Sequence, residues 1–112
     1  MFVAMNRFTV TAGREAEFET AWRERDSRLA EVPGFRDFLL LKGDGEYISH
    51  STWDSAEAFA AWTESEAFAM AHRQRLPEGV LAGPPRFSGY DVVLRQEAPR
   101  ADRAAVQAQV LR

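Results

Sequence analysis

Strand-like and helix-like stretches follow one another in a fixed order along residues 1–95 of this chain. Residues 2–10, 35–41, 46–53 and 87–95 are rich in β-forming side chains and predict four strands. Apolar side chains at helical spacing predict a helix over residues 14–31 and a second helical region that begins at Asp54 and starts again near Thr63. The resulting order, β-α-β-β-α-β, predicts an α+β, ferredoxin-like domain with one four-stranded antiparallel sheet.

Cap and turn residues mark the ends of these segments. The expected signals are Thr11 as the cap of the first helix, Pro33 and Gly34 as its end, the sequence Gly43-Asp44-Gly45 as a hairpin turn, Asp54 with Glu57 as a capping box, and Thr63 or Ser65 as a further cap. Residues 76–86 hold three prolines and two glycines and predict a long loop, of the kind that often covers a ligand. The tail, residues 96–112, is expected either to form a short helix or to fray.

The second predicted strand raises the question of what covers the sheet. Its residues 38–41 are all apolar, which is typical of a strand buried on both faces. The chain has helices for one face and no further elements for the other. We therefore expect two copies to pack sheet against sheet as a homodimer.

Composition excludes several classes of protein. The 112 residues contain no cysteine, which excludes disulfides, cysteine-ligated metals and a thiol nucleophile. The net charge of −3 does not favour nucleic acid as a partner. No apolar stretch is long enough to cross a bilayer and the first residues do not resemble a secretion signal, so no membrane association and a cytoplasmic location are expected.

Three residues stand out as a possible ligand-binding set. Asn6 is an amide in an otherwise apolar strand, Trp62 is a large aromatic in the second helical region, and His72 lies ten positions later. An amide donor, an aromatic and one imidazole suit a planar, iron-bearing ligand such as haem, with one axial histidine. Each residue alone has an ordinary structural role: hydrogen bonding within a strand, core packing, and an exposed helical position. The other histidine, His50, is assigned no role.

Longer motifs resemble a known family. They are residues 6–13 (NRFTVTAG), 33–35 (PGF), 53–55 (WDS), 58–62 (AFAAW) and 68–73 (FAMAHR). Over residues 2–95 the chain resembles the Isd-type haem-degrading monooxygenases, members of the antibiotic biosynthesis monooxygenase superfamily of dimeric α+β barrels. The resemblance implies that residues 1–95 form one such domain and that residues 96–112 are a tail outside the pattern.

The resemblance also implies roles for the three residues. His72 would be the proximal ligand of haem iron, Asn6 would donate to dioxygen at the iron on the distal side, and Trp62 would press the porphyrin out of plane. Haem would be substrate and cofactor together, and dioxygen with electrons from an external donor, such as a reductase, would open the ring and release iron. Arg73, Arg75 and Arg86 are candidates for the haem propionates.

Two other functions remain open from the sequence. Members of the same superfamily oxidise phenols or quinols without a cofactor, and His72 would then be incidental or an acid–base group. Alternatively, the protein binds haem, or another small molecule, without catalysis. The fold by itself does not separate these functions.

Overall fold

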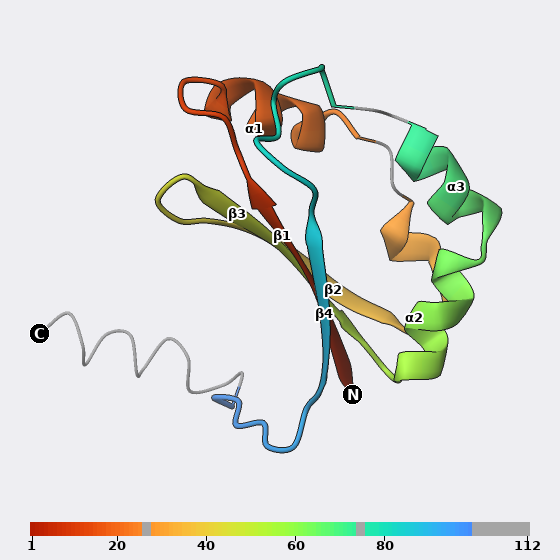
Figure 1. The fold of residues 1–112 in the computed structure, drawn as a ribbon. Coiled ribbons are helices and arrows are strands. Elements are labelled where there is room, and N and C mark those ends of the chain that lie inside the picture. Colours follow the sequence, from red (N-terminus) through yellow and green to blue (C-terminus); the bar gives the residue numbers. More distant parts are fainter. Residues whose placement is uncertain (26–27, 74–75, 100–112) are drawn as a thin grey trace, which may run out of the picture.

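The structure is a computed structural model that describes residues 1–25, 28–73 and 76–99. One antiparallel sheet has the strand order β2-β3-β1-β4, and all the helices lie on one of its faces (Figure 1). The strands are β1 (Phe2–Thr9), β2 (Phe35–Lys42), β3 (Glu46–Trp53) and β4 (Arg86–Asp91). The helices are α1 (Glu15–Arg23), the short 3-10 helix η1 (Leu29–Glu31), α2 (Ala56–Thr63) and α3 (Glu66–Arg73). The predicted α+β, ferredoxin-like fold is confirmed.

Alternation along the central strands sorts their side chains between two environments. Ala4, Asn6 and Phe8 of β1 face the helices, and the residues between them face away. Beneath α1, Phe8 joins a buried core of aromatic and aliphatic side chains, namely Val10, Phe18, Tyr47 and Val80. Near the other end of the sheet, Trp53 is fully buried among the aromatic rings of Phe35, Phe59 and Trp62. The pocket described below lies between these two groups.

The first helix is shorter than predicted. A helix over residues 14–31 is wrong: α1 ends at Arg23, Arg28 adopts a left-handed backbone conformation with φ of 53°, and η1 follows. A left-handed residue cannot continue a right-handed helix, so the chain turns here. Carboxylate Glu19 fixes α1 to the sheet by accepting hydrogen bonds from the Tyr47 hydroxyl and, at 2.9 Å, from Lys42 Nζ.

Two of the expected helix caps are wrong. Thr11 does not cap α1, because its hydroxyl donates instead to the carbonyl of Gly79 at 2.6 Å. Asp54 does not open α2, because Ser55 is the cap and accepts from the amide of Ala58 at 3.1 Å. Asp54 forms an ion pair with Arg36. At the next helix the expectation is confirmed, since Ser65 Oγ accepts from the amide of Phe68 at 3.2 Å.

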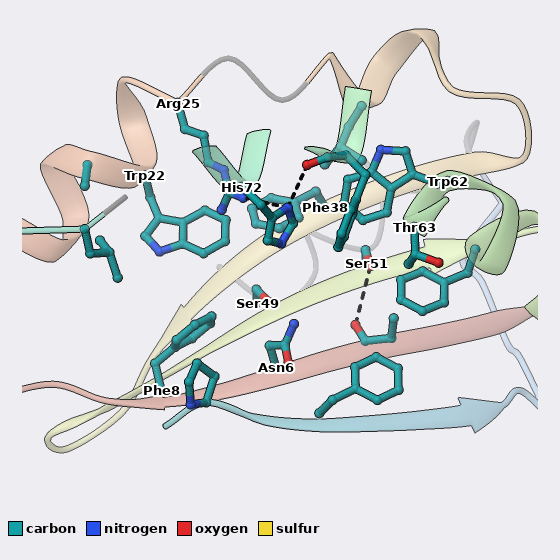
Figure 2. Close-up of a pocket in the computed structure, with 18 of the residues that line it drawn as sticks. Asn6, Phe8, Trp22, Arg25, Phe38, Ser49, Ser51, Trp62, Thr63 and His72 are labelled. Carbon is teal, nitrogen blue, oxygen red and sulfur yellow. Dashed lines mark hydrogen bonds between the residues drawn. The ribbon is translucent and has the colours of Figure 1, made fainter. Parts of the chain in front are cut away.

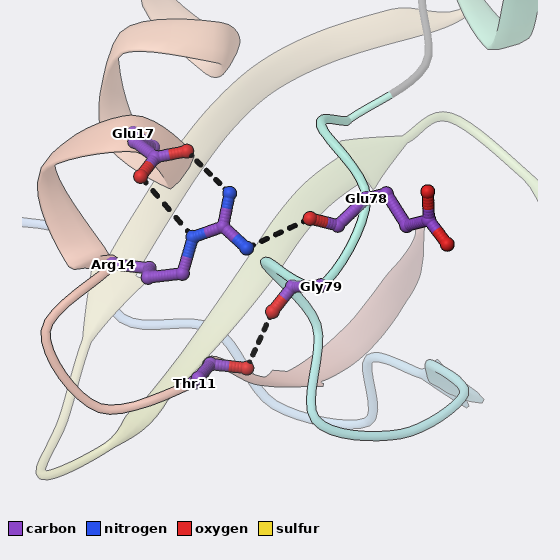
Figure 3. A network of polar contacts seen from close by, with 5 residues as sticks. All are labelled: Thr11, Arg14, Glu17, Glu78 and Gly79. Atoms are coloured by element: carbon purple, nitrogen blue, oxygen red, sulfur yellow. Dashed lines mark hydrogen bonds and ion pairs between the residues drawn. The ribbon is translucent and has the colours of Figure 1, made fainter.

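The loop over residues 76–86 is tied to the turn between β1 and α1 (Figure 3). Arg14 holds the Glu17 carboxylate with two nitrogens and donates with the third to the carbonyl of Glu78 at 2.7 Å. Leu81 forms a β-bridge with Val10, and Val80 is fully buried in the core. Residues 78–81 of this loop are therefore held against the rest of the domain.

The far face of the sheet carries apolar side chains that the chain itself does not cover. Leu39, Leu41 and Tyr90 are 51%, 41% and 54% exposed. A single chain leaves one face of residues 38–41 uncovered, so the expected burial of that face against a second copy stays a prediction. β4 is also shorter than the predicted 87–95, and residues 92–99 leave the sheet without regular structure. The rest of the predicted tail, residues 100–112, lies outside the described residues. No helix in the described part of the chain is long and apolar enough to span a membrane.

Candidate functional site

A pocket of about 660 Å³ lies between the helical layer and the sheet (Figure 2). Its floor comes from the helix-facing residues of all four strands. Its walls come from α1, α2, α3 and the loop after α3. The lining is mostly aromatic and aliphatic, with a few polar side chains at its floor and mouth. Such a pocket suits a large, flat, apolar ligand with a small number of polar anchoring points.

All three residues predicted from the sequence line this one pocket. Asn6 rises from β1 in the floor, Trp62 comes from α2, and His72 comes from α3 (Figure 2). His72 lies across the pocket from Asn6, so a flat ligand between them would meet an imidazole on one face and an amide on the other. Asn6 is half-buried, and within the described part of the chain its carboxamide makes no hydrogen bond. It is therefore free to bind a ligand.

His72 is held by the residue one helical turn before it. Its ring stacks on the ring of Phe68, with 3.8 Å between centroids, and its Nδ1 lies 2.9 Å from the Phe68 carbonyl oxygen. A carbonyl accepts only, so this contact assigns the ring proton to Nδ1. The lone pair of Nε2 is then available to a metal. Arg25 Nη2 lies 3.4 Å from the same Nδ1. That contact is the longer of the two and requires the opposite tautomer, so we assign the proton from the Phe68 contact.

The surroundings of His72 favour a neutral ring. Burial of the ring lowers its pKa from the ordinary value near 6.5, and the positive charge of Arg25 lowers it further. The hydrogen bond to the Phe68 carbonyl opposes these effects in part. A neutral imidazole with a fixed tautomer is the form in which histidine binds iron.

Trp62 is both a core residue and part of the pocket wall. Its indole stacks on buried Trp53, with 5.4 Å between centroids, and meets the edge of Phe68 at 4.8 Å. Its Nε1 is buried with no hydrogen-bond partner in the described residues. Packing on both sides leaves the indole little freedom, so it presents a rigid surface to the pocket.

Sequence reasoning missed Arg25, which follows α1. Its guanidinium lies over the ring of Trp22 at 4.7 Å and its Nε is buried with no hydrogen-bond partner among the residues described. Burial lowers the pKa of Arg25. The sequence did contain a signal for this contact: Arg25 follows Trp22 by three positions, and residues three apart on a helix share a face. Of the arginines predicted to meet propionates, Arg86 is exposed at the start of β4, whereas the side chain of Arg73 and all of Arg75 lie outside the described residues.

Two aromatic residues outside the predicted set, Trp22 and Phe59, also line the pocket. Trp22 stacks on Phe38 at 5.6 Å and forms one wall, and Phe59 lies parallel to Phe87 at 5.5 Å near the other end. Among the described residues, no three histidine or carboxylate side chains gather to hold a metal ion. His72 alone suits an iron that brings its other ligands with it, as a porphyrin does.

Comparisons with known proteins agree with this geometry. Residues 1–74 match the antibiotic biosynthesis monooxygenase family. A mycobilin-producing heme oxygenase of Mycobacterium tuberculosis is 36% identical over an alignment of 84 residues that covers 72% of this chain and 79% of that protein. A staphylobilin-producing heme oxygenase of Staphylococcus haemolyticus is 28% identical over 67% of this chain and 76% of that protein.

The solved structures include a close match in shape. The heme-degrader MhuD of Mycobacterium tuberculosis, with two hemes bound in its active site, superposes with a TM-score of 0.71 at 33% identity. That match covers 87% of this chain and all of the other. The chain therefore belongs to the antibiotic biosynthesis monooxygenase family and, within it, to the group of Isd-type haem-degrading monooxygenases.

Proposed function

We propose that this protein binds haem in the pocket and opens the porphyrin ring with dioxygen, releasing iron. One observation carries the proposal: a neutral imidazole with a free Nε2 faces an unbonded carboxamide across an aromatic pocket. The haem oxygenases named above support it, because they are similar over most of this chain.

His72 would hold the iron through Nε2. The Nδ1 hydrogen bond to the Phe68 carbonyl and the stacked phenyl ring fix the direction of that lone pair. Haem supplies the redox-active iron, and a single protein ligand leaves its opposite face open to dioxygen. A hydrogen bond from Nδ1–H also increases the electron-donating power of the ligating nitrogen.

Asn6 would act on that opposite face. Its amide N–H groups can donate to oxygen as negative charge develops there, which is the kind of electrostatic stabilisation that lowers reaction barriers in dry sites. Trp62, held by Trp53 and Phe68, would press on the flat ligand and distort it, because the indole itself has little room to move.

Arg25, an arginine at the edge of the pocket, would meet a haem carboxylate. Arg25 is part of the pocket wall and has a buried nitrogen without a partner in the described structure. Arginine binds carboxylates with paired hydrogen bonds, so Arg25 is suited to the role. Arg86, the candidate from the sequence, pairs with Arg7 on the face of the sheet away from the helices and does not line the pocket.

The protein would work as a homodimer in the cytoplasm, with a separate reductase as electron donor. The far face of the sheet supports dimerisation, because Leu39, Leu41 and Tyr90 form an apolar surface on a face without helices. Leu39 and Leu41 lie on β2 and Tyr90 lies on β4, at the two edges of the sheet, so a second copy would pack across its full width. An electron donor is required by the chemistry, since ring opening with dioxygen consumes electrons, and we propose a separate reductase for that role.

The proposal is tested by titrating the purified protein with haemin and following the Soret absorbance. We expect saturable binding by the wild type and loss of the ligated spectrum in His72→Ala. The matched control is His50→Gln, which changes the other histidine on the far face of the sheet and should keep the wild-type spectrum. Absence of haem binding by the wild type would favour a cofactor-independent oxygenase, for which oxygen uptake with a quinol is the assay.

A further inference from the structure

A serine lies directly beside Asn6 in the floor of the pocket. Ser49 of β3 pairs with Asn6 of β1 across the antiparallel ladder, and both side chains line the pocket (Figure 2). Side chains of directly paired residues point to the same face of a sheet and lie close together. Ser49 is only 9% exposed, so its hydroxyl lies in a largely dry environment.

The hydroxyl of Ser49 has no hydrogen-bond partner among the described residues. Ser51, two positions later on the same strand and face, differs in this respect. Its hydroxyl accepts from Trp53 Nε1 at 2.9 Å and lies 3.5 Å from the carbonyl of Ala4. The unpaired hydroxyl of Ser49 is therefore open to the pocket, where a ligand or water can bind it.

We propose that Ser49 is a second hydrogen-bonding residue, beside Asn6, for a small ligand on the face of haem opposite His72; this rests on the proposed function. A hydroxyl both donates and accepts. It can therefore accept from one amide hydrogen of Asn6 and donate its own proton to the ligand. The two side chains are not hydrogen-bonded to each other in this structure; with a ligand bound, this contact would orient the Asn6 amide, and the pair would supply two donors instead of one.

Such a pair distinguishes ligands by their ability to accept hydrogen bonds. Azide bound to ferric haem carries negative charge and accepts readily, whereas carbon monoxide bound to ferrous haem accepts weakly. Loss of the Ser49 hydroxyl should therefore weaken azide and leave carbon monoxide almost unchanged. A purely structural role for Ser49 would affect both ligands alike or neither.

The experiment uses the haem-loaded protein and measures equilibrium binding of both ligands by absorbance. We expect Ser49→Ala to raise the Kd for azide by about 3- to 10-fold, the effect of one hydrogen bond, with the carbon monoxide Kd within twofold of wild type. Ser49→Thr keeps the hydroxyl and should restore azide binding. The matched control is Thr52→Val, at a residue of the same strand that has the same exposed fraction, 9%, and does not line the pocket; it should keep wild-type azide affinity.

The possible failures are distinguishable. A wild-type protein that binds no haem would overturn the proposed function together with this inference. If the wild type binds haem and Ser49→Ala keeps its azide affinity, or loses azide and carbon monoxide equally, the role of Ser49 alone is overturned.

Discussion

The imidazole of His72 stacks on the ring of Phe68 and donates from Nδ1 to the carbonyl of the same residue. One helical turn thus fixes the orientation and the tautomer of the only histidine that lines the pocket within the described chain. The side chain and the backbone of Phe68 contribute separately, and this allows their effects to be tested separately.

Removal of the Phe68 ring should weaken haem binding while leaving the hydrogen bond to its carbonyl in place. We expect Phe68→Ala to raise the Kd for haem by about 2- to 10-fold, the range for loss of one aromatic stacking contact. Met70→Ala, on an exposed part of the same helix, is the control and should bind haem as the wild type does. Equal losses in both variants would indicate general destabilisation of α3 and contradict a specific role for the ring.

The pH dependence of the site follows from the lowered pKa of His72, for which burial is the main cause and the charge of Arg25 the second. The folded protein holds the ring neutral at pH values where the unfolded chain already binds a proton. Stability should therefore fall as the pH decreases below about 6.5, and should not change above it on account of this residue. NMR titration of the His72 ring measures its pKa directly.

Removal of the positive charge at Arg25 should raise the pKa of His72, because one of the two causes that lower it is lost. The loss of haem binding at acid pH should then occur at a higher pH in Arg25→Gln than in the wild type. Arg23→Gln, an exposed arginine on α1 that pairs with Glu19, is the matched control. An unchanged titration in Arg25→Gln would show that the neighbouring charge has no influence.

The bridge from Arg14 to the carbonyl of Glu78 should limit motion of the loop beside the pocket. In Arg14→Ala, we expect faster hydrogen exchange at the amide of Val80, whose side chain is fully buried next to this bridge. Exchange in β1 and β3 should stay unchanged. If Val80 exchanges at the wild-type rate, the side chain of Arg14 does not hold the loop.

If two copies pack through the far face of the sheet, a single negative charge introduced on that face should separate them. Leu39→Glu should yield monomers in sedimentation experiments, since a carboxylate would be buried without a partner between the two sheets. Met70→Glu introduces the same charge at a side chain with the same exposed fraction, 51%, and should remain dimeric. A monomeric wild type would exclude this interface.

Much of the fold was predictable because local patterns decided it. The bounds of β3, the hairpin turn before it and the shared face of Phe68 and His72 all follow from alternation and helical spacing over a few residues. The predicted cap Thr11 was wrong because a distant residue binds its side chain. Thr11 binds Gly79, 68 positions away, and no local rule contains that contact.

The candidate site was likewise predictable only where local patterns or residue types decided it. Asn6, Trp62 and His72 were identified from their residue types and a family pattern, and the structure brings them to one pocket. Ser49 and Arg25 were missed because their significance is tertiary. A serine in a strand is ordinary until its cross-strand neighbour is known to be Asn6. Arg25 falls inside the helix predicted over residues 14–31, whereas α1 ends at Arg23 and Arg25 lies at the pocket.

Turnover of bound haem tests the central claim most directly. Haem-loaded wild-type protein is mixed in air with ascorbate or a reductase, while the Soret absorbance and ferrous iron captured by a chelator are recorded together. The proposed function predicts decay of the Soret band with release of iron, and slower decay in Asn6→Ala at unchanged haem affinity. A wild-type Soret band that persists, with no iron released, would contradict haem degradation and indicate a haem-binding protein without this activity.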